Sequence, residues 1–167
     1  MILPVLIFFL LLAADQYTKQ LALSTLDHGS VSVIPGLFDL HLVMNPGAAF
    51  GLFANLPDEQ RRIALLGVSV VALIVVVRLF LAEAKGDRLS LFALSGILSG
   101  AVGNIIDRFR FDAVVDFLDF YLGGSHWPAF NIADSAICVG VCVLILRLGF
   151  APSKTGAIVN APVKSNV

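Results

Sequence analysis

Residues 63–82 read IALLGVSVVALIVVVRLFLA, an apolar run whose one charged residue is Arg78. At about 1.5 Å per residue, a helix of this length covers about 30 Å, the thickness of the hydrocarbon core of a bilayer. The rest of the chain agrees, because 58% of its 167 residues are hydrophobic and only 14% are charged, against about 45–50% and about 25% in soluble domains. The sequence therefore predicts an integral membrane protein. The net charge of −1 gives no indication of a nucleic-acid partner.

Three further apolar stretches, at residues 1–23, 91–107 and 129–150, bring the prediction to four transmembrane helices. The length suits one compact unit, so we expect a single four-helix domain over residues 1–150. Residues 151–167 contain Pro, Ser and Lys without periodicity and are predicted to form a disordered cytoplasmic tail.

A β-hairpin is predicted between helices 1 and 2, where residues 30–43 alternate apolar and polar side chains around Pro35-Gly36. We expect this hairpin to belong to a small extracytoplasmic β-cradle of about residues 30–50. Asp58 follows a proline and precedes a glutamate, which predicts the start of a short helix before the second span.

An even number of spans places both termini on the same side of the membrane. Lys and Arg residues number six on the side of the termini and five on the other. Because positive charge favours the cytoplasmic side, both termini are expected in the cytoplasm.

Polar residues gather where the predicted helices meet the outer edge of the membrane. An ionisable group at the centre of a membrane helix costs roughly 2.5–3.5 kcal/mol even on the most lenient scale, so such residues are rare without a partner or a wet cavity. Segments far apart in sequence thus supply acids, amides and bases to one plane, which favours a functional site there. The residues are Asp15, Gln16, Lys19, Asn45, Gly47, Asn104, Asp107, Arg108, Asp116, Asn131 and Asp134.

Several of these residues also have structural interpretations. Asp15 and Lys19 are four residues apart, so an ion pair on one helix explains them as well as a direct role does. Asp107 and Arg108 are adjacent at a helix end and are expected to form a structural pairing network. On spacing alone, the segment that contains Asn45 could be a simple turn.

The two cysteines, Cys138 and Cys142, lie four residues apart inside an apolar run. This spacing indicates small core residues on one helix face. The sequence contains no Cys-x-x-Cys pair or Cys/His cluster, so neither a zinc site nor a redox site is indicated.

Asp116 and Asp134 are harder to explain structurally, because each lies in apolar company. Two carboxylates held close together cannot both ionise, so one pKa rises and the pair shares a proton. One member can then act as general base on a water while the other polarises a carbonyl, as in aspartic proteases. Spacing alone leaves a proton relay, an ion site and structural pairing open as alternatives.

Five short motifs in order make the chain resemble the lipoprotein signal peptidase (signal peptidase II) family of bacterial membrane aspartic peptidases. The resemblance extends from the first helix to the fourth. The motifs are Asp15-Gln16-Tyr17-Thr18-Lys19, Asn45-Pro46-Gly47-Ala48-Ala49-Phe50, the stretch from Gly100 to Asn104-Ile105-Ile106-Asp107-Arg108, Val114-Val115-Asp116-Phe117, and Phe130-Asn131-Ile132-Ala133-Asp134-Ser135.

The resemblance implies a role for each candidate residue. Asp116 and Asp134 would be the catalytic dyad. The supporting and substrate-binding residues would be Asn104, Arg108 and Asn131 around the dyad, Asn45 and Gly47 in the substrate-facing cradle, and Asp15 and Lys19 holding helix 1 at the site.

The implied reaction is removal of the signal peptide from a prolipoprotein, with cleavage N-terminal to the diacylglyceryl-modified cysteine. The implied enzyme is a multi-pass, monomeric protein of the bacterial cytoplasmic (inner) membrane, with membrane lipids around it and its site near the outer leaflet. It would need no metal or organic cofactor, and the cyclic peptide globomycin would inhibit it.

Two other classes of protein are also compatible with these acids. A small transporter or channel subunit could use the acids as a cation or proton pathway, although the chain lacks the internal repeat common in transporters. A structural scaffold could merely pair the acids with the nearby basic residues.

Overall fold

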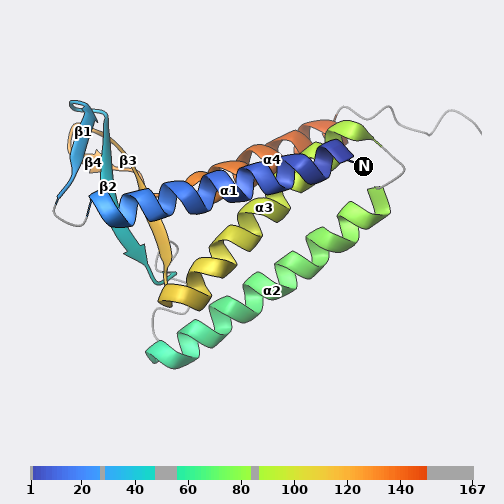
Figure 1. Cartoon of the computed structure of the whole chain (residues 1–167), viewed down its shortest axis with the longest axis horizontal. Helices are drawn as coiled ribbons and strands as arrows, with labels where there is room; N and C mark the ends of the chain where they lie inside the picture. The colour runs from blue at the N-terminus through green and yellow to red at the C-terminus, as the bar shows by residue number, and fades with distance from the viewer. Residues whose placement is uncertain (1, 27–28, 48–55, 84–86, 150–167) are drawn as a thin grey trace, which may run out of the picture.

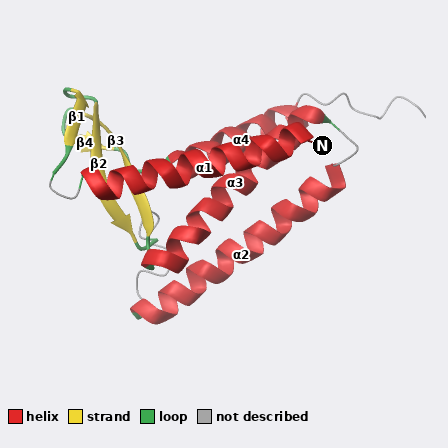
Figure 2. Cartoon of the chain, viewed as in Figure 1, coloured by secondary structure: helices red, strands yellow, loops and turns green. Residues whose placement is uncertain are grey.

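The computed structural model describes residues 2–26, 29–47, 56–83 and 87–149. The described residues form four helices and four strands (Figures 1 and 2). They are α1 (Ile2–Thr25), β1 (Val31–Ile34), β2 (Phe38–Asn45), α2 (Asp58–Glu83), α3 (Arg88–Phe111), β3 (Val114–Leu122), β4 (Ser125–His126) and α4 (Ile132–Gly149). Among the described residues, α1, α2 and α3 are long and apolar enough to cross a membrane.

The predicted short helix before the second span is wrong in one respect. Asp58 does begin a helix, but that helix is α2 itself, which continues unbroken to Glu83. Arg61 pairs with Asp58 at 2.6 Å within the first turn of α2. The sequence has no proline or glycine between this turn and the apolar run that begins at residue 63, so the helix continues without a break. The predicted tail and the end of the predicted cradle lie outside the described residues.

The four strands form one antiparallel sheet in the order β1-β2-β3-β4. The hairpin of β1 and β2 confirms the prediction for residues 30–43. Strand β3 was not predicted, because its residues lie in the connection that leads to α4. It pairs with β2 so that Phe38 lies opposite Phe120 and Asn45 opposite Val114. Figure 1 shows the sheet at the end of the bundle where α1 and α3 end.

A small apolar core attaches the sheet to α1. Ala22 and Leu26 at the end of α1 pack with Phe117 of β3, and Leu40 and Ile132 flank them. This contact fixes β3 beside the end of α1 and the start of α4.

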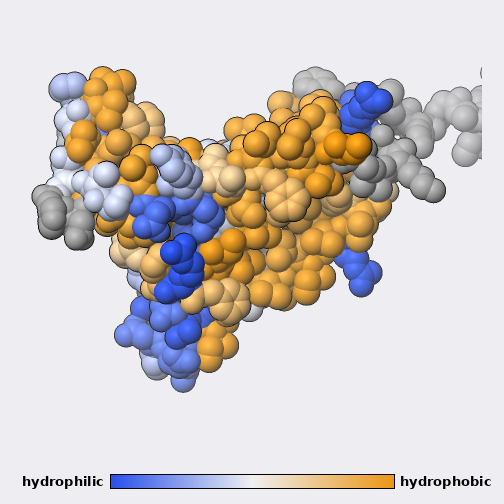
Figure 3. Space-filling model, viewed as in Figure 1, coloured by the Kyte–Doolittle hydropathy of each residue, from blue (hydrophilic) through white to orange (hydrophobic). Residues whose placement is uncertain are grey.

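Helices α1, α3 and α4 pack together, and α2 lies against α3. No residue of α2, all of which is described, is buried. Cys138 and Cys142 are also exposed on α4, so their expected place in the core is wrong. Lipid tails are as apolar as a protein core, so a membrane helix can point small apolar side chains outward. Figure 3 shows this outer surface as hydrophobic along the helices, with hydrophilic residues mainly where α2 begins and α3 ends and a few at the opposite end of the helices.

Gly100 lets α3 and α4 approach closely. A Cβ atom at this position would overlap the carbonyl oxygen of Ala133 and the side chain of Ile137. Small residues at such crossings are the usual way in which membrane helices pack.

Gly100→Ala is therefore expected to lower stability by roughly 1–3 kcal/mol, the usual cost of overpacking. Gly67→Ala is the matched control, because a Cβ at Gly67 of α2 has no neighbour within 4 Å. Thermal unfolding of both variants in detergent would measure the difference. Equal destabilisation by both would contradict this account of the α3–α4 contact.

Candidate active site

Asp116 lies on β3, opposite Val43 of β2, and only 1% of its surface is exposed. The side-chain amide of Asn45, two residues further along β2, donates a 2.9 Å hydrogen bond to its Oδ2. The amide of Asn131 donates a 2.7 Å bond to its Oδ1. Both carboxylate oxygens are thus held by neutral donors from two different segments.

Asp134 lies in the first turn of α4 and forms a reciprocal helix cap with Asn131. Its backbone N–H donates to Asn131 Oδ1 at 2.9 Å, and its Oδ2 accepts from the backbone N–H of Asn131 at 3.3 Å. This is the capping-box arrangement, in which two residues three apart satisfy each other's free N–H groups. Asn104 of α3 donates to the other oxygen, Oδ1, at 2.7 Å.

Asn131 therefore joins the two acids, since its side chain bonds to Asp116 and to the backbone of Asp134. Its position follows from the preceding residue, Phe130, which pairs with Leu118 of β3 through backbone hydrogen bonds in both directions. This bridge brings the start of α4 beside β3. The structure thus places Asp116 and Asp134 in one cluster.

A buried ion network lies beside the two acids. Lys19 Nζ is 3.0 Å from Asp15 Oδ2, 2.8 Å from Asp107 Oδ2 and 2.9 Å from Asn104 Oδ1. All three charged side chains are at most 3% exposed. Asn104 therefore connects this network to Asp134.

The carboxylates of the network also hold backbone groups. Asp15 Oδ1 accepts the N–H of Ala133 at the start of α4, at 2.9 Å, and Asp107 Oδ2 accepts the N–H of Val115, at 3.1 Å. These bonds tie α1 to α4 and α3 to β3. The network thus fixes the elements that carry both acids.

The expected ion pair between Asp15 and Lys19 is confirmed. The expectation that Asp107 belongs to a structural pairing network is confirmed, but its ion-pair partner is Lys19 and not the adjacent Arg108. Gln16, which the sequence placed with Asp15 and Lys19 in the polar group, joins the same network, because its amide donates to Asp107 Oδ1 at 3.2 Å.

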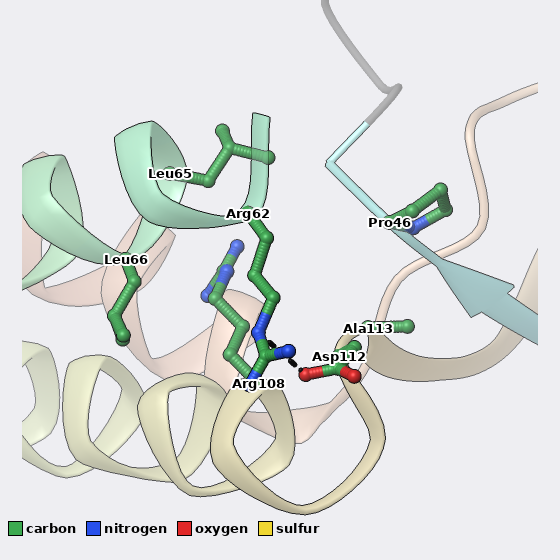
Figure 4. A pocket seen from close by; sticks show the side chains of 7 residues that line it. All are labelled: Pro46, Arg62, Leu65, Leu66, Arg108, Asp112 and Ala113. Atoms are coloured by element: carbon green, nitrogen blue, oxygen red, sulfur yellow. Dashed lines mark ion pairs between the residues drawn. The ribbon is translucent and has the colours of Figure 1, made fainter. Parts of the chain in front are cut away.

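Arg108 lies one helical turn after Asn104 on α3. Its Nη1 donates to the backbone oxygen of Asn104 at 3.0 Å, and its charge is within electrostatic reach of Asp134 and Asp116. It lines a small hollow together with Arg62, which pairs with Asp112 at 2.7 Å (Figure 4).

The segment from Asn45 to Gly47 is both a turn and part of the site. Asn45 Oδ1 accepts the backbone N–H of Gly47 at 2.9 Å, while its amide binds Asp116. Gly47 has a φ of 93°, and a Cβ there would overlap the side chain of Leu65 on α2. The backbone conformation therefore favours glycine here, and a larger residue would also displace the end of the Leu65 side chain.

The environment of Asp116 favours its protonated form. Burial raises the pKa of Asp116 to about 6, and the charge of Asp134 acts in the same direction. Hydrogen bonds from Asn45 and Asn131 and the charge of Lys19 oppose this rise without cancelling it. A carboxyl group with a pKa near neutrality can exchange a proton at physiological pH.

Comparison with known proteins shows the family to which the chain belongs. The family described as "Signal peptidase (SPase) II" matches residues 7–150. The chain is 50% identical over 142 residues to the lipoprotein signal peptidase of Desulforapulum autotrophicum, covering 84% of this chain and 88% of that protein. It is 47% identical to that of Geobacter metallireducens, covering 82% and 84%. A solved bacterial membrane enzyme, determined by the in meso method, superposes with a TM-score of 0.80 at 31% identity over 92% of this chain and 96% of that one. The chain therefore belongs to the signal peptidase II family.

Proposed function

We propose that this protein is a membrane-embedded aspartic endopeptidase that removes the signal peptide from prolipoproteins. Cleavage would occur N-terminal to the diacylglyceryl-modified cysteine. The family membership and the relatives named lipoprotein signal peptidase support the reaction class. The observation that carries the chemistry is Asn131, which hydrogen bonds to Asp116 and to the backbone of Asp134.

In the proposed mechanism, Asp116 and Asp134 share one proton. The ionised carboxylate takes a proton from a water as the water oxygen attacks the scissile carbonyl carbon. The protonated carboxyl group donates to the carbonyl oxygen, which gives a tetrahedral diol. A proton then passes to the amide nitrogen as the C–N bond breaks, and the modified cysteine leaves with a free amine. The pair titrates as a unit, so the apparent pKa values belong to the dyad.

The surrounding residues would orient the dyad rather than react. Asn45 and Asn104 each hold one carboxylate oxygen, on Asp116 and Asp134 respectively. Lys19 would offset part of the negative charge of the pair. Arg108, with its charge near both acids, would contact the substrate backbone.

We further propose a topology that follows from these assignments. Helix α4 would be the fourth span of a single domain over residues 1–150, with both termini in the cytoplasm of the bacterial inner membrane. The sheet end would then lie at the outer leaflet and act as a cradle for the peptide. A lipid-modified precursor could reach the site laterally through the bilayer. We expect a monomer that is inhibited by globomycin.

The test uses the purified full chain in detergent with two precursors, one diacylglyceryl-modified and one unmodified. We expect cleavage of the modified precursor, with a new N-terminus at the modified cysteine identified by mass spectrometry. Cleavage of neither precursor, together with ion flux through the protein in liposomes, would support the alternative of a small transporter or channel.

Activity is expected to fall as pH rises through about 6, because Asp116 then loses the proton that the dyad shares. Asn45→Ala removes a hydrogen bond that lowers this pKa, so the alkaline limb of kcat/KM should move to higher pH. His41→Gln is the control, because His41 is an exposed titratable residue on the same strand. A limb that moves in His41→Gln but not in Asn45→Ala would contradict the assignment to Asp116.

A further inference from the structure

A narrow apolar groove of about 380 Å³ lies where α1, α3 and α4 meet. Its position is separate from the acid cluster. On α4, Ile132, Ala136, Val139 and Val143 follow the spacing of one helix face. Asp134 lies two residues from both Ile132 and Ala136 and therefore points to the opposite side of the helix. The proposed peptidase chemistry leaves the groove unexplained.

The length of the groove matches one leaflet of a bilayer. Ile132 and Val143 lie at its limits on α4, about 16 Å apart along a helix axis. The hydrocarbon core of a membrane is about 30 Å thick, so each leaflet contributes about half of that.

The width of the groove suits one hydrocarbon chain. A volume of about 380 Å³ over about 16 Å gives a mean cross-section of about 24 Å², or a channel about 5 Å across. Carbon atoms in contact lie about 4 Å apart, so a single extended chain fits.

Two arginines lie at the end of the groove away from the sheet. Arg147 follows Val143 by one turn on the same face of α4, and Arg88 immediately precedes the lining residue Leu89. Arg147 pairs with Asp87 at 3.0 Å and remains half exposed. Arg88 is exposed and makes no ion pair with any residue in the described part of the chain.

The nearby carboxylates are already engaged. Asp87 caps α3 by accepting from the backbone N–H and hydroxyl of Ser90 at 2.9 and 3.0 Å. Glu83 accepts the backbone N–H of Asp87 at 2.7 Å. The guanidinium groups are therefore the charges at this end that a ligand can approach, and arginine favours phosphate.

We propose that this groove binds a bilayer phospholipid, with one acyl chain between α1 and α4 and the phosphate beside Arg88 and Arg147. The lipid belongs to the leaflet at the end of the bundle where α1 begins and α4 ends (Figure 1). It is distinct from the lipid-modified substrate, whose reacting bond must reach Asp134 on the opposite side of α4. The proposal does not depend on the peptidase function.

Native mass spectrometry of the full chain in mild detergent tests this proposal. The wild type should retain one phospholipid per chain through delipidation. Val139→Trp should fill the groove and abolish retention, whereas Val141→Trp, on an exposed part of the same helix that does not line the groove, should retain the lipid. Replacing both arginines with glutamine should weaken retention by about tenfold, because charge-assisted hydrogen bonds to phosphate are lost. Retention of no lipid by the wild type, or equal retention by both tryptophan variants, would overturn the proposal.

A second measurement covers the case in which Val139→Trp does not fold. A phospholipid with a photoreactive group in its acyl chain is added to the wild type in vesicles, and labelled peptides are mapped after irradiation. Labels should concentrate on Leu11, Phe92 and Val143 of the groove. Labelling spread evenly between these residues and exposed α2 residues such as Val71 and Leu81 would show ordinary bilayer contact and refute the site.

Discussion

Asp116→Asn and Asp134→Asn are each expected to reduce kcat/KM for a lipid-modified precursor by roughly 10⁴-fold, the upper range for general acid–base groups. An amide neither takes a proton from water nor shares one with the remaining carboxyl group. In the wild type, both carboxylate oxygens of Asp116 accept hydrogen bonds, one from Asn45 and one from Asn131. The amide nitrogen would thus lie opposite another N–H group. Single-turnover cleavage of the modified precursor is the measurement.

Asp119→Asn provides the matched control for these variants. Asp119 is a buried acid on β3, three residues after Asp116, but its carboxylate contacts His126 at 2.9 Å. Its replacement should leave cleavage within a few-fold of the wild type. All three variants should insert and keep the helix content of the wild type, which circular dichroism would establish. Retained cleavage by either Asp116→Asn or Asp134→Asn would remove that residue from the dyad.

The membrane class and the β1–β2 hairpin were predictable because both depend on local patterns. A 20-residue apolar run and a Pro-Gly turn can be read without knowing what they contact. The pairing of β2 with β3 could not be predicted, since Phe38 and Phe120 lie opposite each other but are far apart in sequence. The apolar residues of β3 gave no signal of length or period that separates a buried strand from a helix end.

The candidate residues were predictable as a set, but several of their partners were not. Adjacent residues on a helix point about 100° apart, so Asp107 and Arg108 cannot face each other. Asp107 faces α1 and binds Lys19, while Arg108 turns back to the oxygen of Asn104. The cap between Asn131 and Asp134 is different, because its three-residue spacing was present in the sequence and belongs to a known capping pattern.

Lys19→Met is expected to destabilise the protein by about 3–5 kcal/mol, the usual cost of removing one partner from a buried ion pair. Asp15 and Asp107 would remain as neighbouring carboxylates without their shared cation, and both are 1% exposed. The loss should lower the thermal unfolding midpoint in detergent. Arg61→Met is the matched control. Arg61 and Asp58 are 2.6 Å apart, as close as the buried pairs, but Asp58 is 93% exposed, so the cost should be below about 1 kcal/mol.

The source of the Lys19 effect can be separated by a double-mutant cycle with Asp107→Asn. Asparagine keeps an oxygen that can accept the N–H of Val115, so this change removes charge while preserving the backbone contact. If the cost of Lys19→Met comes from uncompensated carboxylates, the double variant should be more stable than the sum of the single losses predicts, with a coupling of about 1–3 kcal/mol. Strictly additive losses would mean that Lys19 stabilises the fold through its packing rather than its charge.

Asn104 offers an independent check, since its Oδ1 accepts from Lys19 and its amide binds Asp134. Cleavage by Lys19→Met, measured below its unfolding midpoint, should fall as well, because Asn104 loses the partner that orients it toward the dyad.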